Sequence, residues 1–196
     1  MKLGWVEDVL SSVSRTAPVV IAGPTASGKS ALAMALARRD GRVIVNADAL
    51  QVYARWRVLT ARPSSADEAQ AAHLLYGHVG RDEMYSVGHW MREAASVLAA
   101  GKPVVIVGGT GLNLSALTEG LVDIPATPVQ IRTLADLRMA SEGLHGLLAE
   151  LDAPTAARID RANPARVQRA WEVLKATGRG LSQWQDETGP ALLPLA

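Results

Sequence analysis

The sequence predicts an α/β fold, in which helices flank a parallel β-sheet, with an all-helical insertion domain after about residue 122. Three short apolar runs, at residues 18–22, 42–46 and 104–107, alternate with segments of helical periodicity. Such alternation favours parallel strands joined by right-handed crossovers. A glycine-rich loop joins the first run to a helix, as expected for a sheet of this kind. After residue 121 the strand-like runs stop and capped helical segments follow, which predicts a separate helical region.

Composition limits the class of protein. Of the 196 residues, 48% are hydrophobic and 20% are charged, as in an ordinary globular domain. The net charge of +1 means that a nucleic-acid partner must be met by a local basic patch. Because there is no cysteine, disulfides and thiol chemistry are excluded. The sequence has neither a signal-peptide pattern nor an apolar run of about 20 residues, so we expect a cytoplasmic protein without a membrane partner.

The loop after the first apolar run carries a phosphate-binding pattern. It consists of Gly23, Pro24, Thr25, Ala26, Ser27, Gly28, Lys29 and Ser30, which fit G-x-x-x-x-G-K-[ST] at every fixed position. In such a loop, backbone N–H groups and a helix N-terminus hold phosphate oxygens. Lys29 then reaches the phosphates and the Ser30 hydroxyl holds Mg²⁺. A glycine-rich turn that fits by chance is the alternative, but the flanking strand and helix favour a di- or triphosphate ligand.

The other elements of the predicted core follow from local patterns. Helices are expected over residues 6–13, 28–39, 65–75 and 86–100. The second of these is apolar nearly all round, which indicates burial, and Asp40-Gly41 ends it. Acidic residues in the first turn favour the third helix, and Ser86 is a suitable N-cap for the fourth. Trp90 lies on the apolar stripe of this last helix and is predicted to belong to the core.

The part after residue 121 is predicted to be helical. Residues 123–128 are typical of a linker, and helices are expected over 143–151, 152–159 and 163–178. In the last of these Asn163 is an N-cap, Pro164 follows at the first helical position, and Gly178 ends the helix. We therefore divide the chain into a P-loop α/β core (1–121), a helical insertion (122–180) and a return segment or tail (181–196).

Two further segments are expected beside the phosphate loop. Asp48 follows the second apolar run, and Gly108-Gly109-Thr110-Gly111 follows the third. In open parallel sheets ligands bind beyond the carboxyl ends of the strands, so both segments should lie at the same rim. The second glycine-rich turn indicates a further close approach of backbone to a ligand, or simply a tight turn.

Five ordered blocks of the sequence resemble one family. They are Gly23–Ser30, Asp48 with Gln51-Val52-Tyr53, Thr60-Ala61-Arg62-Pro63, Gly108-Gly109-Thr110-Gly111-Leu112, and Arg166–Val173 with Thr177-Gly178. Together they are similar to the tRNA dimethylallyltransferases (tRNA isopentenyltransferases), over roughly residues 18–182. The resemblance implies a P-loop NTPase-like core with an inserted helical domain that grips tRNA. It also implies transfer of a dimethylallyl group from dimethylallyl diphosphate to the exocyclic amine of an adenosine next to the anticodon.

The resemblance also implies roles for particular residues. Lys29, with Mg²⁺ held through Ser30, would bind the departing diphosphate, and Asp48 would take the proton of the amine unless it is a metal-shell ligand or caps the following turn. Thr110 would hydrogen-bond the diphosphate or the acid–base site, or be a plain turn residue. The residues expected to bind the anticodon stem-loop of tRNA are Gln51, Arg62, Arg166 and Arg169. Gln51 would read the adenine edge or cap a helix, and the basic helix surface would contact RNA phosphates or be merely solvated.

The sequence departs from the family pattern at Ala49, Arg62, Asn113 and Pro164, where a serine, a lysine, a tyrosine and an aspartate are usual. We also expect the chain to lack the C-terminal third of the family, and to be a monomer. Two other functions stay open. A small-molecule P-loop kinase shares the loop, but Gly108-Gly109 stands where a Walker-B carboxylate is expected. A catalytically silent nucleotide- or RNA-binding fragment is the other alternative.

Overall fold

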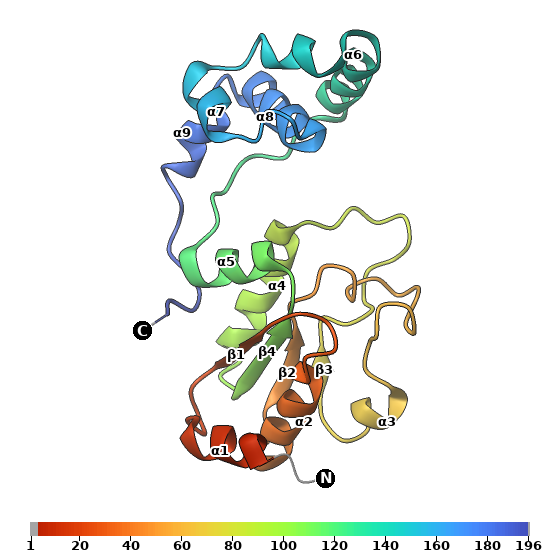
Figure 1. The fold of residues 1–196 in the computed structure, drawn as a ribbon, viewed down its shortest axis with the longest axis vertical. Coiled ribbons are helices and arrows are strands. Elements are labelled where there is room, and N and C mark those ends of the chain that lie inside the picture. Colours follow the sequence, from red (N-terminus) through yellow and green to blue (C-terminus); the bar gives the residue numbers. More distant parts are fainter. Residues whose placement is uncertain (1–3, 196) are drawn as a thin grey trace. The chain divides into compact units, whose positions relative to one another are not determined.

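A four-stranded parallel sheet forms the centre of the first part of the chain (Figure 1). The computed structural model describes residues 4–195, so the outermost ends of the expected segments 1–121 and 181–196 lie outside it. The strands are β1 (Val19–Ala22), β2 (Val43–Asn46), β3 (His73–Leu74) and β4 (Val104–Gly108), in the spatial order β1-β4-β2-β3. The three strands predicted from the sequence and their parallel direction are thus confirmed.

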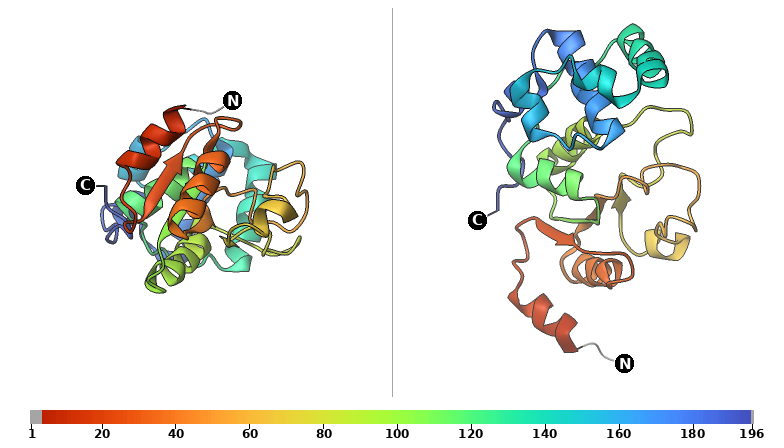
Figure 2. Two further views of the ribbon diagram at one scale, coloured as in Figure 1. Left: turned by 90° about the horizontal axis from the view of Figure 1, so that it is seen from below. Right: turned by 45° about the horizontal axis from the view of Figure 1, so that its top comes forward.

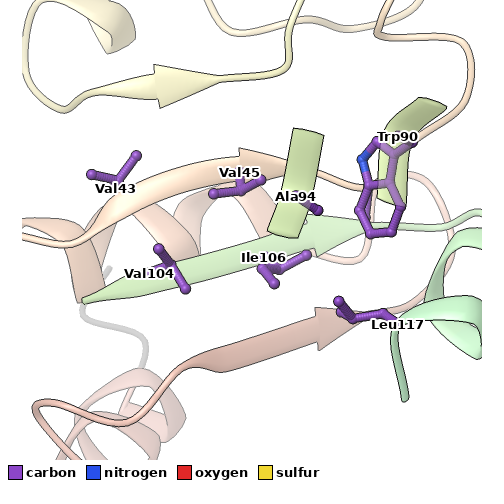
Figure 3. Close-up of a cluster of buried hydrophobic side chains, with 8 residues drawn as sticks. Val43, Val45, Trp90, Ala94, Val104, Ile106 and Leu117 are labelled. Atoms are coloured by element: carbon purple, nitrogen blue, oxygen red, sulfur yellow. The ribbon is translucent and has the colours of Figure 1, made fainter. Parts of the chain in front are cut away.

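Both faces of the sheet are covered, which explains why its strands are continuously apolar. Alternate residues point to opposite faces of a strand. On one face Val45 and Ile106 pack with Trp90 and Ala94 of α4 (Val87–Ala99) and with α5 (Gly111–Glu119) (Figure 3). On the other face Ile44, Val105 and Val107 pack against α2 (Lys29–Asp40). The predicted N-cap Ser86 and the core position of Trp90, which is 0% exposed, are confirmed.

A buried ion pair joins Arg42, before β2, to Asp40 at the end of α2, and Arg42 also binds the segment after α1 (Gly4–Ser12). Helix α1 lies beside α2 (Figure 2). The Arg42 guanidinium donates to Asp40 at 2.9 Å and to the carbonyl oxygens of Ala17 and Val104 at 2.7 and 3.0 Å. Arg39 also donates to the Asp40 carboxylate, at 2.6 Å. Hydrogen bonds from Arg39, and then from Arg42, lower the pKa of Asp40 to about 2.

The helix predicted over residues 65–75 is wrong in length. Only α3 (Ser65–Glu68) forms, and the chain then extends into β3. Ser64 starts α3 with a capping box, as its hydroxyl accepts from the amide of Asp67. The helix does not continue because the backbone groups that follow it form hydrogen bonds with β2 instead. The amide of Ile44 donates to the carbonyl of Ala72, and Ile44 pairs with His73.

Residues Leu121–Pro190 form a second compact unit, and the remainder of the described chain forms the first. The second unit contains α6 (Val129–Leu148), α7 (Ala153–Arg158), α8 (Pro164–Thr177) and α9 (Leu181–Gln185). Helix α6 packs against α8 around a buried core that includes Trp171. The capping residues Asn163 and Gly178 and the core position of Trp171 are confirmed. No helix in residues 4–195 is long and apolar enough to span a membrane.

The start of the second unit was not predicted correctly. The helix expected over 143–151 is the second half of α6, which begins at Val129 and bends at Gly143, where φ is 67°. The first half escapes detection because Pro128 provides no side-chain cap. Its exposed residues Leu134 and Leu137 also blur the apolar stripe. Helix α9 carries no side-chain cap either and was not predicted.

The charge of Asp40 should control acid stability. Asp40→Asn is expected to lower the midpoint of thermal unfolding by several degrees at neutral pH, because Arg42 stays buried without its counter-charge. The folded-state pKa lies below the unfolded value of 3.8. The carboxylate therefore stabilises the fold above that value, and the contribution is lost as the pH falls toward about 2.

Circular dichroism melts across the acid range measure this effect. The difference between wild type and Asp40→Asn should shrink below about pH 4. Asp82→Asn is the matched control, because the Asp82 side chain is 93% exposed and its pair with Arg81 spans 3.7 Å. A difference between wild type and Asp40→Asn that stayed constant down to the lowest pH would contradict this role of the ion pair.

Candidate functional site

The phosphate loop leads from β1 into the first turn of α2. Gly28 stands immediately before the helix with φ 85° and ψ 5°, a left-handed conformation that favours glycine. Because Gly28 has no side chain, it offers no oxygen to accept hydrogen bonds from the first backbone amides of α2. These amides and the positive end of the helix dipole form an anion-binding position. The Lys29 ammonium folds back over the loop and donates to the carbonyl of Pro24.

The turn that carries Asp48 is held by the side chain of Asn46, which is 0% exposed at the end of β2. Asn46 Oδ1 accepts from the amide of Asp48 at 2.8 Å, and its Nδ2 donates to the carbonyls of Asp48 and Leu75 at 2.9 and 3.0 Å. Asp48 Oδ1 in turn accepts from the amide of Leu50 at 2.8 Å. The carboxylate of Asp48 is therefore fixed at the rim of the sheet and only half-buried.

Two residues near the Asp48 turn were not identified from the sequence. Asn46 is one, and its signal was a polar residue at the end of an otherwise apolar buried strand. Tyr76 is the other. Burial, followed by the negative charge of Asp48, raises the pKa of the Tyr76 phenol, which therefore stays protonated beside the site. No local pattern marked Tyr76, because its relation to Asp48 arises only from the pairing of β2 with β3.

Thr110 connects the Asp48 turn to the end of β4. Its Oγ1 accepts from the amide of Ala49 at 3.0 Å. Thr110 occupies the N-cap position of α5, but its hydroxyl makes no capping hydrogen bond to that helix. A hydroxyl has one proton to donate as well as lone pairs to accept with. The bond to Ala49 uses a lone pair, which leaves the proton available to another acceptor.

The two glycines before Thr110 let three strand ends converge. A Cβ on Gly108 would lie 2.4 Å from both the carbonyl carbon and the oxygen of Ala47, after β2. A Cβ on Gly109 would lie 3.1 Å from the carbonyl oxygen of Gly23, in the phosphate loop. The two glycines therefore let the backbone of this turn approach the ends of β1 and β2 closely. This approach brings the loop after β1, Asp48 and Thr110 to one rim.

Gln51 and Arg62 hold the loop between residues 53 and 62. Gln51 Nε2 donates to the carbonyl of Thr60 at 2.8 Å. The Arg62 guanidinium donates to the carbonyls of Tyr53 and Ala54 at 3.2 and 3.1 Å. It also lies directly against Gly77, where a Cβ would come within 2.0 Å of it. Both side chains are therefore engaged in fixing the backbone near Asp48.

In the second unit most of the predicted basic surface is paired with carboxylates. The ion pairs are Arg158–Asp186 and Lys175–Glu150 at 2.7 and 2.8 Å, Arg169–Glu172 at 3.8 Å, and Arg179–Glu187 at 2.5 Å. Arg169 also donates to the hydroxyl of Thr127 at 2.6 Å. Within residues 4–195 the exposed side chains of Arg161 and Arg166 make no ion pair. The free positive charge of the second unit is thus smaller than the sequence indicated, and it remains at Arg161 and Arg166.

The sheet order, the loop after β1 and the shared rim define a P-loop NTPase-like α/β protein that carries a helical unit. Comparison with known proteins narrows this class. A family profile described as IPP transferase matches residues 51–195, and a second, described as isopentenyl transferase, matches residues 17–77. The chain belongs to the IPP transferase family.

Named relatives agree with this assignment. The chain is 64% identical over 187 residues to a tRNA dimethylallyltransferase of Cereibacter sphaeroides (strain KD131), an alignment that covers 95% of this chain and 60% of the relative. It is 60% identical over 177 residues to a tRNA dimethylallyltransferase of Ruegeria sp. (strain TM1040), which covers 90% of this chain and 60% of the relative. The chain thus spans about 60% of the length of these curated relatives.

Solved structures of the family share the fold. A eukaryotic dimethylallyltransferase acting on tRNA is similar with a TM-score of 0.73 and 25% identity, over 90% of this chain and 46% of that one. The full-length tRNA isopentenylpyrophosphate transferase of Bacillus halodurans is similar with a TM-score of 0.52 and 31% identity, over 83% of this chain and 56% of that one. Both bear out the expected fold class.

The close approach of the strand ends predicts that a methyl group added at Gly108 destabilises the fold. Gly108→Ala should lower the free energy of unfolding by about 1–3 kcal/mol, because the new Cβ meets main-chain atoms that cannot rotate away. Gly111→Ala is the control, since its Cβ would meet nothing within 4 Å. That variant should change stability by less than about 1 kcal/mol. Urea unfolding measures both, and equal stabilities of the two variants would argue against the close contact with Ala47.

Proposed function

We propose that this chain belongs to an enzyme that transfers a dimethylallyl group from dimethylallyl diphosphate to the N6 amine of an adenosine next to the anticodon of tRNA. The observation that carries the proposal is the shared rim, where the phosphate loop, Asp48 and Thr110 meet through Gly108 and Gly109. Relatives that are 60–64% identical are named tRNA dimethylallyltransferases, which supports the same reaction. The same rim would then bind the diphosphate at the phosphate loop and place the Asp48 carboxylate beside the N6 amine.

The phosphate loop stabilises the leaving group. As the bond between the allylic carbon and the diphosphate oxygen breaks, negative charge accumulates on that oxygen. The first amides of α2 and the Lys29 ammonium bind this charge more strongly in the transition state than in the ground state, which accelerates the reaction. Lys29 exchanges its bond to the Pro24 carbonyl for the diphosphate, a change that needs only rotation of its side chain.

Mg²⁺ fits this site as a partner of the diphosphate. The Ser30 side chain is exposed in the first turn of α2 and lies next to Lys29. Within residues 4–195 no three His, Asp or Glu side chains gather to hold a metal. Mg²⁺ commonly binds substrate phosphates, waters and few protein oxygens. The Ser30 hydroxyl would supply the protein oxygen, and the bound ion would neutralise charge on the diphosphate.

Asp48 and Thr110 act on the acceptor. The N6 amine of adenine is a weak nucleophile because its lone pair is delocalised into the ring. The Leu50 amide holds Asp48 Oδ1, so Oδ2 takes the proton as the new carbon–nitrogen bond forms. The hydroxyl of Thr110, fixed through Ala49, donates to the diphosphate or to the adenine. A positioned base of this kind typically contributes 10²–10⁴-fold to the rate.

The second unit is proposed to bind the anticodon stem-loop. Arg166 offers an unpaired positive charge within the described chain, and Arg169 is part-exposed despite its contact with Glu172. Phosphate contacts from these side chains would give salt-dependent affinity. Gln51 and Arg62 support RNA binding indirectly, by fixing the loop near Asp48. We place this reaction in the cytoplasm, and the proposed chemistry requires only one copy of the chain.

The two other candidate functions are not favoured. A P-loop kinase is expected to carry a carboxylate at the end of the strand beside the loop, but β4 ends at Gly108, where a side chain would collide with Ala47. A silent binding fragment would not require Asp48 to be held by three side-chain and backbone contacts. The named relatives favour prenyl transfer over both.

Lys29→Ala tests the phosphate loop. It should weaken binding of dimethylallyl diphosphate and of pyrophosphate, measured calorimetrically with Mg²⁺, while the thermal midpoint stays unchanged because Lys29 makes no core contact. Charge-assisted bonds of this kind are worth about 1.5–3 kcal/mol, or roughly 10- to 100-fold in affinity. Lys102→Ala, an exposed lysine before β4, is the control. Unchanged affinity in Lys29→Ala would refute the assignment of the loop.

Asp48→Asn tests the base. The amide oxygen of asparagine can still accept from Leu50, so the turn and substrate binding should be preserved. Turnover of an unmodified anticodon stem-loop should fall by at least about tenfold, because the proton acceptor is lost. Asp82→Asn controls for the change of net charge at an exposed position. Full turnover in Asp48→Asn would remove Asp48 from the mechanism.

A further inference from the structure

The loop after the Asp48 turn presents a large aromatic side chain to solvent. Trp56 is 64% exposed, although tryptophan is among the side chains that gain most from burial. Its φ is 60°, which is unusual for a bulky residue. Such backbone strain persists only where surrounding contacts impose it, and it is concentrated at functional sites. The exposure of Trp56 therefore calls for an explanation.

Polar contacts, rather than the indole, hold this loop. Thr60 donates from both its amide and its hydroxyl to the carbonyl of Trp56, each at 2.9 Å. Gln51 then holds the carbonyl of Thr60. Arg57 donates to the carbonyl of Pro63 at 2.9 and 2.6 Å and pairs with Glu68 at 2.7 Å. The backbone of Trp56 is thus fixed while its side chain stays outside, so the indole is not needed for the fold of the loop.

The loop belongs to the same rim as Asp48. The segments that follow β2 and β3 remain paired. The amide of Gly77 donates to the carbonyl of Gln51, and Tyr53 forms a parallel bridge with Val79. The segment from 54 to 62 leaves directly from this bridge, at the carboxyl ends of the strands (Figure 1). Gln51 links it back to the turn that begins at Asp48. The loop of Trp56 therefore adjoins the turn that carries Asp48.

The charge around Trp56 indicates which ligand it meets. Arg55, its neighbour, is exposed and makes no ion pair within residues 4–195. Of the three arginines between residues 48 and 62, Arg57 pairs with Glu68 and Arg62 binds backbone carbonyls, which leaves Arg55 available to a ligand. A flat aromatic face next to a free arginine matches a single-stranded nucleic acid, in which bases stack on aromatic side chains while cations follow the phosphates.

We propose that Trp56 is a stacking platform for an unpaired base of the RNA substrate, and that Arg55 contacts an adjacent phosphate. The inference rests on the proposed function, because it takes the RNA from there. It adds a positioning residue that none of the five sequence blocks contains. By holding the neighbouring base, Trp56 orients the acceptor adenosine toward Asp48.

Binding of a fluorescently labelled anticodon stem-loop tests the proposal. Stacking on one aromatic side chain is worth about 1–3 kcal/mol, so Trp56→Ala should weaken binding by roughly 5- to 150-fold. Trp56→Phe should recover most of the affinity, because phenylalanine keeps a flat face. Val58→Ala is the matched control in the same loop, since Val58 is 93% exposed and offers no ring. Affinity for dimethylallyl diphosphate should be unchanged in all three variants.

Two further readouts separate stacking from a structural defect. The slope of log affinity against log salt should stay unchanged in Trp56→Ala but become shallower by roughly 0.7 in Arg55→Ala, which loses one phosphate contact. A blunt-ended RNA duplex should bind wild type and Trp56→Ala equally, because all of its bases are paired and stacked inside the helix. Quenching of tryptophan fluorescence by the stem-loop should be smaller in Trp56→Phe than in wild type.

The outcomes distinguish this inference from the proposed function. If wild type binds the stem-loop and Trp56→Ala binds it equally well, the platform is refuted while the proposed function stands. If wild type binds dimethylallyl diphosphate but no stem-loop, both the platform and the RNA substrate are refuted. If Trp56→Ala and Val58→Ala lose affinity equally, the loop matters only through its shape and the inference fails.

Discussion

The candidate site depends on the space left by two missing side chains, at Gly108 and Gly109. The backbone of Ala47 occupies the position of a Cβ on Gly108, and the Gly23 carbonyl lies close to that of a Cβ on Gly109. The ends of β1, β2 and β4 therefore meet at one rim, and the bond from Ala49 to Thr110 ties two of them together. Catalysis by proximity requires a leaving-group site and a proton acceptor to be held at short range. For the proposed reaction, these backbone contacts would bring the phosphate loop and the Asp48 turn to the same rim.

Around this rim, side chains that bind backbone carbonyls replace regular secondary structure. Asn46, Gln51 and Arg62 each hold segments that no strand ladder reaches. Arg42 does the same at the opposite end of β2, where it is buried with Asp40. Buried polar groups of this kind are stable only when their hydrogen bonds are satisfied. These polar side chains of the first unit therefore stabilise loops, which leaves fewer of their hydrogen-bonding groups free to contact a ligand directly.

In the helical unit, charged side chains also bind one another and stabilise the fold. Glu150 accepts from Lys175, Arg138 and the indole of Trp171, and these hydrogen bonds lower its pKa to about 2. These contacts join α6 and α8 across their apolar core. A cation already paired with a carboxylate gains less from a phosphate, since it must first give up its partner. The RNA binding proposed for this unit would therefore depend on a few positions rather than on the whole basic surface.

The sequence by itself determined what depends on neighbours along the chain. The three main strands, the phosphate loop from Gly23 to Ser30, and the caps of α4 and α8 follow from runs and spacings of a few residues. Only the tertiary structure decided that residues 73–74 form a strand, because a partner in β2 takes their hydrogen bonds. It likewise decided that Gln51 and Arg62 bind carbonyls, and that Trp56 stays exposed. Each of these depends on contacts outside the few residues that a local pattern spans, so the sequence alone did not predict them.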